Sequence, residues 1–199
     1  GMLWYPLSMG IFILCLGSLY TLILGYDSMF YIPYLSAGLL VWQFILRGVN
    51  EGANALISSR LQITNMPIPP FVYIFRTVCR NLIVFMLTLI THVIVLVVMQ
   101  YRIGAGLLLF PVGLLLLVLN AVWIGTILGI LCARYRDLVP LIGNIMQPMF
   151  FITPIIWHKD KIGAKADLFT IWNPFYHFVE IVRAPLLMQV PEMFSILYV

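Results

Sequence analysis

Long apolar runs separated by short polar connections are the dominant pattern of this chain. Five of these runs are each long enough to form a helix that crosses a bilayer. They cover approximately residues 3–25, 33–56, 80–100, 107–132 and 138–157. The last run contains Pro140, Pro148 and Pro154, so we expect kinks in its helix. The pattern predicts an all-α integral membrane protein with about five transmembrane helices.

The composition supports the same class of protein. Hydrophobic residues make up 63% of the chain and charged residues only 9%, whereas a soluble domain carries about 25% charged residues. The net charge of +4 comes largely from arginines at the ends of the apolar runs, so we expect a membrane and no nucleic acid as a partner. Cys15, Cys79 and Cys132 show no CxxC spacing, and we expect neither a disulfide nor a metal site.

A polar stripe lies in the second half of the second run. Arg47, Asn50, Glu51 and Asn54 are spaced i, i+3, i+4 and i+7, which places them on one helical face. Arg47 and Glu51 are one turn apart and could form an ion pair. Because this face cannot lie against lipid tails, it faces a bundle interior, a water-filled path or the headgroups. Two interpretations follow: a structural polar seam near the membrane surface, or a part in gating or substrate passage.

Arginines are concentrated in alternate connections between the runs. The connections after the second and fourth runs contain Arg60, Arg76, Arg80, Arg134 and Arg136, whereas those after the first and third contain only Arg102. The positive-inside rule therefore places the arginine-rich connections and the N-terminus in the cytoplasm. The polar segment 158–190 then lies outside, although its three lysines and one arginine count against this orientation.

Three local patterns refine the expected helices. Gly125 and Gly129 form a GxxxG pair that permits close helix packing, within the chain or between chains. Asp137 is well placed to cap the helix that begins at the next residue. The third pattern is a set of apolar residues spaced i, i+3, i+4 and i+7, namely Phe175, Phe178, Val179 and Val182. It predicts a short amphipathic helix from Pro174, lying at a membrane interface and ended by Pro185. The extracellular segment is thus expected to hold re-entrant or amphipathic helices.

Signatures of catalysis are missing from the sequence. No P-loop occurs, no run carries paired carboxylates, and no cluster of metal ligands is visible. We therefore expect no enzyme activity but a channel or permease body that is driven by another protein.

Five motifs, in this order along the chain, are similar to those of one family. LSAGLLVWQF followed by RGVNEGANALISS is similar to that family's second helix, and RLQITNMPIPPFVYIFR to its cytoplasmic coupling helix. ARYRDL is similar to the turn before the fifth helix, and QPMFFITPIIW to the proline-broken helix after it. WNPFYHFVEIVRAPLL is similar to the extracellular segment. The chain thus resembles the membrane subunit of ABC-2 type exporters, and among them the polysaccharide exporters of the O-antigen, capsule and teichoic acid type.

The resemblance implies an assembly and a direction of transport. It implies a homodimer in the inner (plasma) membrane, with a central channel that moves a lipid-linked polysaccharide outward. Two copies of a separate nucleotide-binding subunit would bind ATP and Mg, and this chain would hold no cofactor. Residues 58–78 would form the coupling segment, with a helix over residues 61–75 docked in a groove of that subunit. Pro67, Pro69 and Pro70 either end this helix or bend it.

The resemblance also assigns roles to individual residues. Those expected to contact the nucleotide-binding subunit are Arg60, Leu61, Ile63, Met66, Pro67, Ile68, Phe71 and Arg76. The turn formed by Arg134, Arg136 and Asp137 would be cytoplasmic. The aromatic residues that could stack on sugar rings are Phe150, Phe151, Trp157, Trp172, Phe175 and Tyr176. An interfacial belt of aromatic side chains is the alternative explanation for these six.

Two departures from the family pattern lead to a further expectation. Family members carry an amphipathic segment before the first span and a sixth span after the extracellular segment, and residues 1–199 show neither. We therefore expect a single ABC-2 domain that is truncated at both ends.

Two other functions are compatible with the sequence: an ABC-2 permease for drugs or small lipids, and a membrane protein of glycan synthesis.

Overall fold

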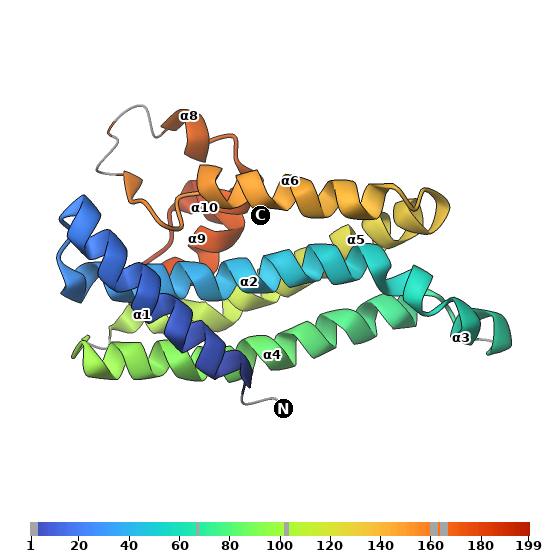
Figure 1. The fold of residues 1–199 in the computed structure, drawn as a ribbon, viewed down its shortest axis with the longest axis horizontal. Helices are drawn as coiled ribbons and strands as arrows, with labels where there is room; N and C mark the ends of the chain where they lie inside the picture. Colours follow the sequence, from blue (N-terminus) through green and yellow to red (C-terminus); the bar gives the residue numbers. More distant parts are fainter. Residues whose placement is uncertain (1–3, 67, 102–103, 160–162, 164–166) are drawn as a thin grey trace.

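The computed structural model describes residues 4–66, 68–101, 104–159, 163 and 167–199. It confirms an all-α protein, since the described residues contain helices and no strand. The long helices are α1 (Trp4–Leu24), α2 (Ser28–Ser58), α4 (Phe71–Val98) and α5 (Phe110–Arg134). The shorter ones are α3 (Arg60–Asn65), η1 (Ala105–Leu109), α6 (Leu138–Ile152), α8 (Asp167–Thr170), α9 (Pro174–Leu186) and α10 (Met193–Tyr198). Figure 1 shows that α2, α4, α5 and α6 run along the long axis and that α1 crosses them obliquely.

Among the described residues, four helical stretches are long and apolar enough to cross a membrane. They correspond to α1, α2, α4 and the continuous η1–α5 unit. The fifth expected span, 138–157, is represented by α6, whose 15 residues measure about 22 Å and fall short of a hydrocarbon core of about 30 Å. The helix ends at Ile152, two residues before Pro154, and residues 153–158 continue without helical structure.

The two ends of the bundle carry different elements. The α3 end carries α3 and the turn between α5 and α6, and the opposite end carries the α1–α2 and α4–η1 connections (Figure 1). α2 has 31 residues and α4 has 28, which corresponds to about 46 Å and 42 Å. Both helices are therefore longer than the hydrocarbon layer is thick, and they extend beyond it.

The helix at the centre of the bundle is α2. It packs against α1, α4, α5, α6 and α9. Of its most apolar window, 72% is buried, against 17% for α1 and for the η1–α5 unit and 28% for α4. The other spans therefore present most of their side chains to the surroundings, which in a bilayer are lipid tails.

Glycines set the closest helix contacts. A Cβ atom on Gly52 of α2 would lie 3.1 Å from the Gly125 Cα atom of α5, and one on Gly129 would lie 3.2 Å from the Gly52 carbonyl oxygen. The GxxxG pair Gly125 and Gly129 thus packs within the chain, on a third glycine. At the opposite end, a Cβ atom on Gly113 would lie only 2.2 Å from the carbonyl oxygen of Ile181 in α9.

The predicted amphipathic helix is present as α9, and Asn173 caps it by accepting a hydrogen bond from the Phe175 amide (3.0 Å). Pro185 lies inside α9 and does not end it, which corrects the expected boundary. Of the two kinds of helix expected here, re-entrant or flat at an interface, the packing favours the first. α9 packs on α2, α5 and η1, and most of its side chains are buried. α10 follows it back into the bundle, where the Asn120 side chain near the middle of α5 donates to the Val199 carbonyl (3.2 Å). The segment is therefore re-entrant, because α5 offers a glycine surface on which it packs.

Replacing Gly113 with alanine should destabilise the protein by about 1–3 kcal/mol, because the added Cβ atom forces α9 away from α5. Thermal unfolding of the detergent-purified protein measures the effect. Gly48→Ala is the matched control, since nothing lies within 4 Å of its added Cβ atom. Equal melting temperatures for the two variants would contradict the close contact.

Candidate functional site

The coupling segment forms two helices and not one. α3 ends at Asn65, Met66 is extended (φ −126°, ψ 136°), and α4 begins at Phe71. The expected helix over residues 61–75 is therefore interrupted, and of the two alternatives for the prolines, an end or a bend, the structure shows an end. A residue before a proline is driven out of the helical region, so the sequence order Met66–Pro67 ends α3. Pro67 itself lies outside the described residues.

An exposed apolar surface covers the coupling segment. We name it the coupling surface and define it by four exposed side chains: Leu61, Met66, Ile68 and Phe71. Arg60 and Arg76 are also exposed, whereas Ile63 is half-buried. Phe71 stacks on Phe75, with 6.5 Å between ring centroids. Exposed apolar side chains gathered on one short segment indicate a surface that binds a protein or a membrane.

The polar stripe of α2 contacts two neighbouring helices, α1 and α4. The Arg47 guanidinium lies over the Tyr5 ring of α1, 4.8 Å from its centroid. Glu51 accepts a hydrogen bond from Arg80 of α4 at 2.8 Å, so the expected Arg47–Glu51 pair does not form. Asn54 donates to the Asn50 backbone carbonyl (3.1 Å). Arg47 and Glu51 thus tie α2 to neighbouring helices, as a structural seam would.

The Arg-Asp turn lies at the α3 end, between α5 and α6. Arg134 donates to the hydroxyl of Tyr135 (3.2 Å). Asp137 occupies the position before α6, but it has helical dihedral angles (φ −68°, ψ −15°) and its side chain caps no backbone amide. The expectation of a side-chain cap is wrong for this residue. Arg136 is exposed at the same turn.

At the opposite end, the non-helical segment after α6 is held by hydrogen bonds to its carbonyl groups. Tyr34 donates to the Pro154 carbonyl (2.8 Å), with the Trp157 carbonyl also in reach (3.2 Å). Tyr31 donates to the Ile156 carbonyl (2.7 Å). These side chains replace the hydrogen bonds that a continuing helix would have made. Irregular backbone at membrane depth is tolerated only where the protein supplies such partners.

Arg183 of α9 completes this arrangement. It is 4% exposed, it donates to the Pro154 carbonyl (2.6 Å) and the Tyr34 hydroxyl (2.7 Å), and it pairs with Glu180. Its guanidinium also lies over the Tyr34 ring, 4.4 Å from the centroid. A cavity of about 330 Å³ adjoins the group, lined by Phe30, His158, Tyr176 and Glu192 among others.

Sequence reasoning missed this cluster. On the sequence alone, Arg183 is used only as one of the charges that bear on membrane orientation. An arginine within an apolar stretch that packs into a bundle, however, needs a buried partner. Glu180, three residues earlier on the same helical face, was the available signal. The two tyrosines carry no distinguishing pattern in the sequence.

The six aromatic residues considered for sugar stacking do not share one surface. Phe150 and Phe175 pack on Trp42 of α2, with centroid distances of 5.7 and 5.8 Å. Tyr176 is buried, and Trp157 is half-buried and donates to the Phe151 carbonyl (2.9 Å). Trp172 and Phe151 are 82% and 65% exposed. These two are the members of the set whose rings are mostly free to receive a ligand.

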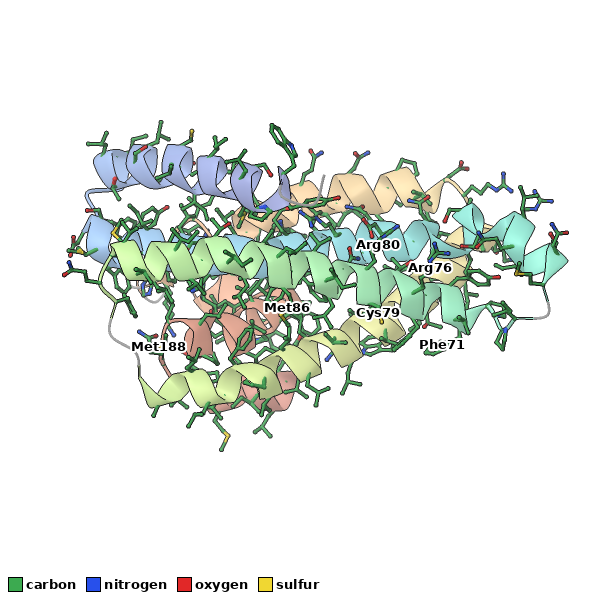
Figure 2. The ribbon with its side chains drawn as sticks, turned by 90° about the horizontal axis from the view of Figure 1, so that it is seen from below. Phe71, Arg76, Cys79, Arg80, Met86 and Met188 are labelled. Carbon is green, nitrogen blue, oxygen red and sulfur yellow. The ribbon has the colours of Figure 1, made fainter. Side chains whose placement is uncertain are left out.

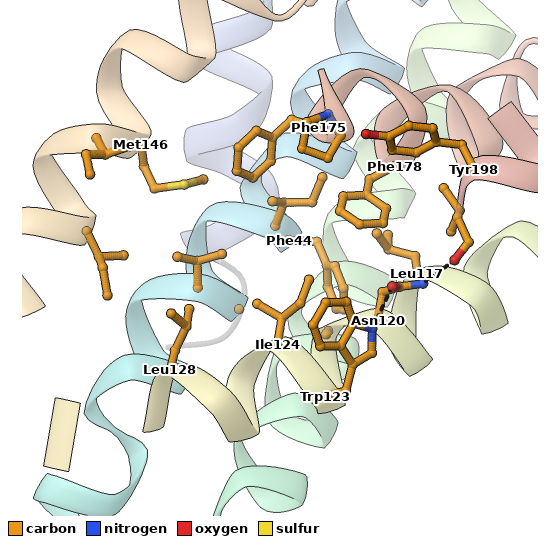
Figure 3. Close-up of a pocket in the computed structure, with 18 residues that line it drawn as sticks. Phe44, Leu117, Asn120, Trp123, Ile124, Leu128, Met146, Phe175, Phe178 and Tyr198 are labelled. Carbon is orange, nitrogen blue, oxygen red and sulfur yellow. Dashed lines mark hydrogen bonds between the residues drawn. The ribbon is translucent and has the colours of Figure 1, made fainter. Parts of the chain in front are cut away.

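A large apolar cavity lies between α2, α5, α6 and the re-entrant helices (Figure 3). Its volume is about 550 Å³, and Phe44, Leu117, Trp123, Met146 and Phe178 are among the side chains that line it. Within the described part of the chain, no three His, Cys, Asp or Glu side chains are placed to hold a metal ion.

The four long apolar helices and their short connections define a multi-pass membrane protein, and comparison with known proteins specifies its kind. Residues 2–187 match the family model described as "ABC-2 type transporter". The chain belongs to this family, and it is therefore the membrane subunit of an ABC transporter and not a catalytic domain. The family implies an ABC ATPase as its partner.

One curated relative shows similarity over most of its length. The chain is 26% identical over 176 residues to the O-antigen export system permease protein RfbA of Myxococcus xanthus. The matched region covers 87% of this chain and 68% of that protein. The resemblance inferred from the sequence motifs is thus confirmed at the level of the family.

Replacing Arg183 with methionine should destabilise the protein by about 3–5 kcal/mol, because Glu180 is left without its buried partner. Thermal unfolding followed by tryptophan fluorescence measures the loss. The double variant Arg183→Met with Glu180→Leu should recover part of it, since no buried charge is then unpaired. Arg136→Met, on the exposed turn, serves as control. An unfolding temperature unchanged by Arg183→Met would refute the structural role.

Proposed function

We propose that this chain is the membrane subunit of an ATP-driven exporter of polysaccharide, of the O-antigen or capsule type, carried on a lipid. The observation that carries the proposal is the similarity to an O-antigen export permease, which spans 87% of the chain. The five sequence motifs, from LSAGLLVWQF to WNPFYHFVEIVRAPLL, also support it, because they occur in the order in which the polysaccharide exporters carry them. The substrate moves outward across the inner membrane.

The proposed assembly is a homodimer with two nucleotide-binding subunits, each of which binds ATP and Mg. The α3 end faces the cytoplasm, as does the N-terminus, and the coupling surface docks on the nucleotide-binding subunit. The exposed apolar side chains Leu61, Met66 and Phe71 support this role, because they lie where the helices extend beyond the hydrocarbon layer. Arg60 is exposed beside them and is free to meet an acidic group.

Glycan contact is proposed for the exposed aromatic residues at the opposite end. Trp172 and Phe151 present flat apolar faces that suit the apolar faces of sugar rings. Three other aromatic residues considered for sugar stacking have a packing role instead: Phe150 and Phe175 pack on Trp42, and Tyr176 is buried.

A second candidate function is favoured by one observation. The apolar cavity of about 550 Å³ (Figure 3) matches a permease for drugs or small lipids better than one for a hydrated glycan.

Docking through the coupling surface is tested with charged substitutions. Met66→Asp and Phe71→Asp should each abolish co-purification of the ATPase subunit, because a carboxylate cannot enter an apolar groove without a partner. Met66→Leu and Phe71→Leu keep the apolar character and should retain the ATPase. Binding that survives both aspartate variants would exclude the docking role.

Export itself is tested in cells that lack the gene. Loss of the chain should remove polysaccharide from the cell surface and accumulate the lipid-linked glycan inside. Trp172→Ala should lower surface polysaccharide several-fold, and Trp172→Phe should restore it, because stacking needs only the ring. A deletion strain with normal surface glycan and altered tolerance to apolar drugs would support the second candidate instead.

A further inference from the structure

We propose that a polar cavity at the α3 end binds the phosphate group of a membrane lipid. The cavity has a volume of about 270 Å³ and lies between the last turns of α2, α3 and the first turns of α4. It is lined by Glu51, Asn54, Ala55, Ser58, Ser59, Gln62, Tyr73, Arg76, Thr77 and Arg80. No sequence motif had brought these residues together.

The charge of the cavity selects an anion. Two arginines, Arg76 and Arg80, face one carboxylate, Glu51. Glu51 is already paired with Arg80 at 2.8 Å. Among the described residues, no acidic group pairs with Arg76, so the lining keeps one uncompensated positive charge. Arginine is the side chain best suited to phosphate, because its planar donors match two phosphate oxygens.

Tyr73 gives an independent indication of a ligand. The residue is 6% exposed, yet its hydroxyl has no hydrogen-bond partner among the described residues. A buried hydroxyl without a partner is costly, and most such groups in folded proteins are paired. Tyr73 and Arg76 both line the cavity, and a phosphate offers acceptor oxygens to each of them.

The depth of the cavity matches the headgroup layer. Counting from Val98 at the opposite end, a hydrocarbon core of about 30 Å corresponds to about 20 helical residues and reaches the neighbourhood of Arg80. The same count from Ser28 along α2 ends near Gly48, one turn before Glu51. The arginines of α4 therefore lie where lipid phosphates lie.

The surface next to the cavity is apolar, so it suits the tail of a lipid better than an acidic side chain of a partner protein. Below Arg76 and Arg80, the same face of α4 continues toward the opposite end with Ile83, Ile90, Ile94 and Val97, each more than half exposed. Figure 2 shows Arg76 and Arg80 near the beginning of α4 and Met86 further along it. A lipid whose phosphate occupies the cavity can lay an apolar chain along this face.

Two lipids share the required chemistry. A glycerophospholipid offers a phosphodiester, and an isoprenoid carrier offers a diphosphate. An isoprenoid diphosphate is a ligand only if the chain exports a lipid-linked glycan, as proposed above. Binding of a glycerophospholipid does not depend on that proposed function.

Native mass spectrometry of the purified chain in detergent tests the site without any transport assay. The protein is titrated separately with phosphatidylglycerol, an isoprenyl diphosphate, inorganic phosphate and diacylglycerol, which has lipid tails but no phosphate. We expect retention of the two phosphate-bearing lipids and not of diacylglycerol. Tighter binding of the isoprenyl diphosphate would identify the carrier as the ligand, and equal binding would identify a general lipid-phosphate site.

Matched variants localise the binding. Arg76→Gln should weaken lipid retention about tenfold and Tyr73→Phe about threefold, as expected for a charge-assisted and a neutral hydrogen bond. Arg76→Lys should lose less than Arg76→Gln. Arg136→Gln, an exposed arginine at the same end, should change nothing. Unchanged melting temperatures show that the variants are folded.

Three outcomes would overturn the proposal. Equal losses for Arg76→Gln and Arg136→Gln would show attraction by surface charge alone. Retention of diacylglycerol as strong as that of the phosphate-bearing lipids would show binding by the tails alone. Loss of the ATPase subunit from Arg76→Gln with unchanged lipid retention would assign Arg76 to the protein interface.

Discussion

The need to satisfy backbone carbonyl groups inside an apolar layer governs the opposite end of this structure. α6 ends at Ile152, and the chain continues without helical hydrogen bonds. Tyr31 and Tyr34 of α2 and Arg183 of α9 supply the missing donors. The tyrosines tie the broken segment to α2 and the arginine ties it to α9, so the break in one helix determines how α9 is held. The Arg183–Glu180 pair follows from the same requirement, because the guanidinium needs a counter-charge where water is scarce.

The α3 end differs, because the described polar side chains gathered there are mostly exposed or half-buried. Polar groups at that end are free to be exposed, and α2 and α4 are joined by the partly exposed Glu51–Arg80 pair. An exposed pair contributes little stability, and it leaves the neighbouring Arg76 available for a ligand or partner. The two ends thus differ in kind: one is a closed network of buried donors and acceptors, and the other is an open surface.

The sequence predicts the fold class well because the length of an apolar run is a local property of the chain and needs no tertiary contact. The GxxxG pair and the amphipathic helix from Pro174 are local patterns, and both appear in the structure. The prolines of the coupling segment leave two possibilities, an end or a bend of the helix. In the structure α3 ends at Asn65, because a residue that precedes a proline disfavours helical dihedral angles. The Arg47–Glu51 pair was wrong because Arg80, distant in sequence, is closer in space to Glu51. The tyrosine–arginine cluster depends on contacts across more than a hundred residues, which periodicity does not encode.

The unbroken length of α2 has a mechanical consequence. It is a stiff rod of about 46 Å with α3 attached at one end and Tyr31 and Tyr34 at the other. Pro33 lies between the two tyrosines and removes a backbone donor there, which makes this the most compliant point of the rod. A tilt imposed at α3 is therefore transmitted along the whole of α2. The helix bends most easily at Pro33, next to the two tyrosines that bind the carbonyl groups of the broken segment.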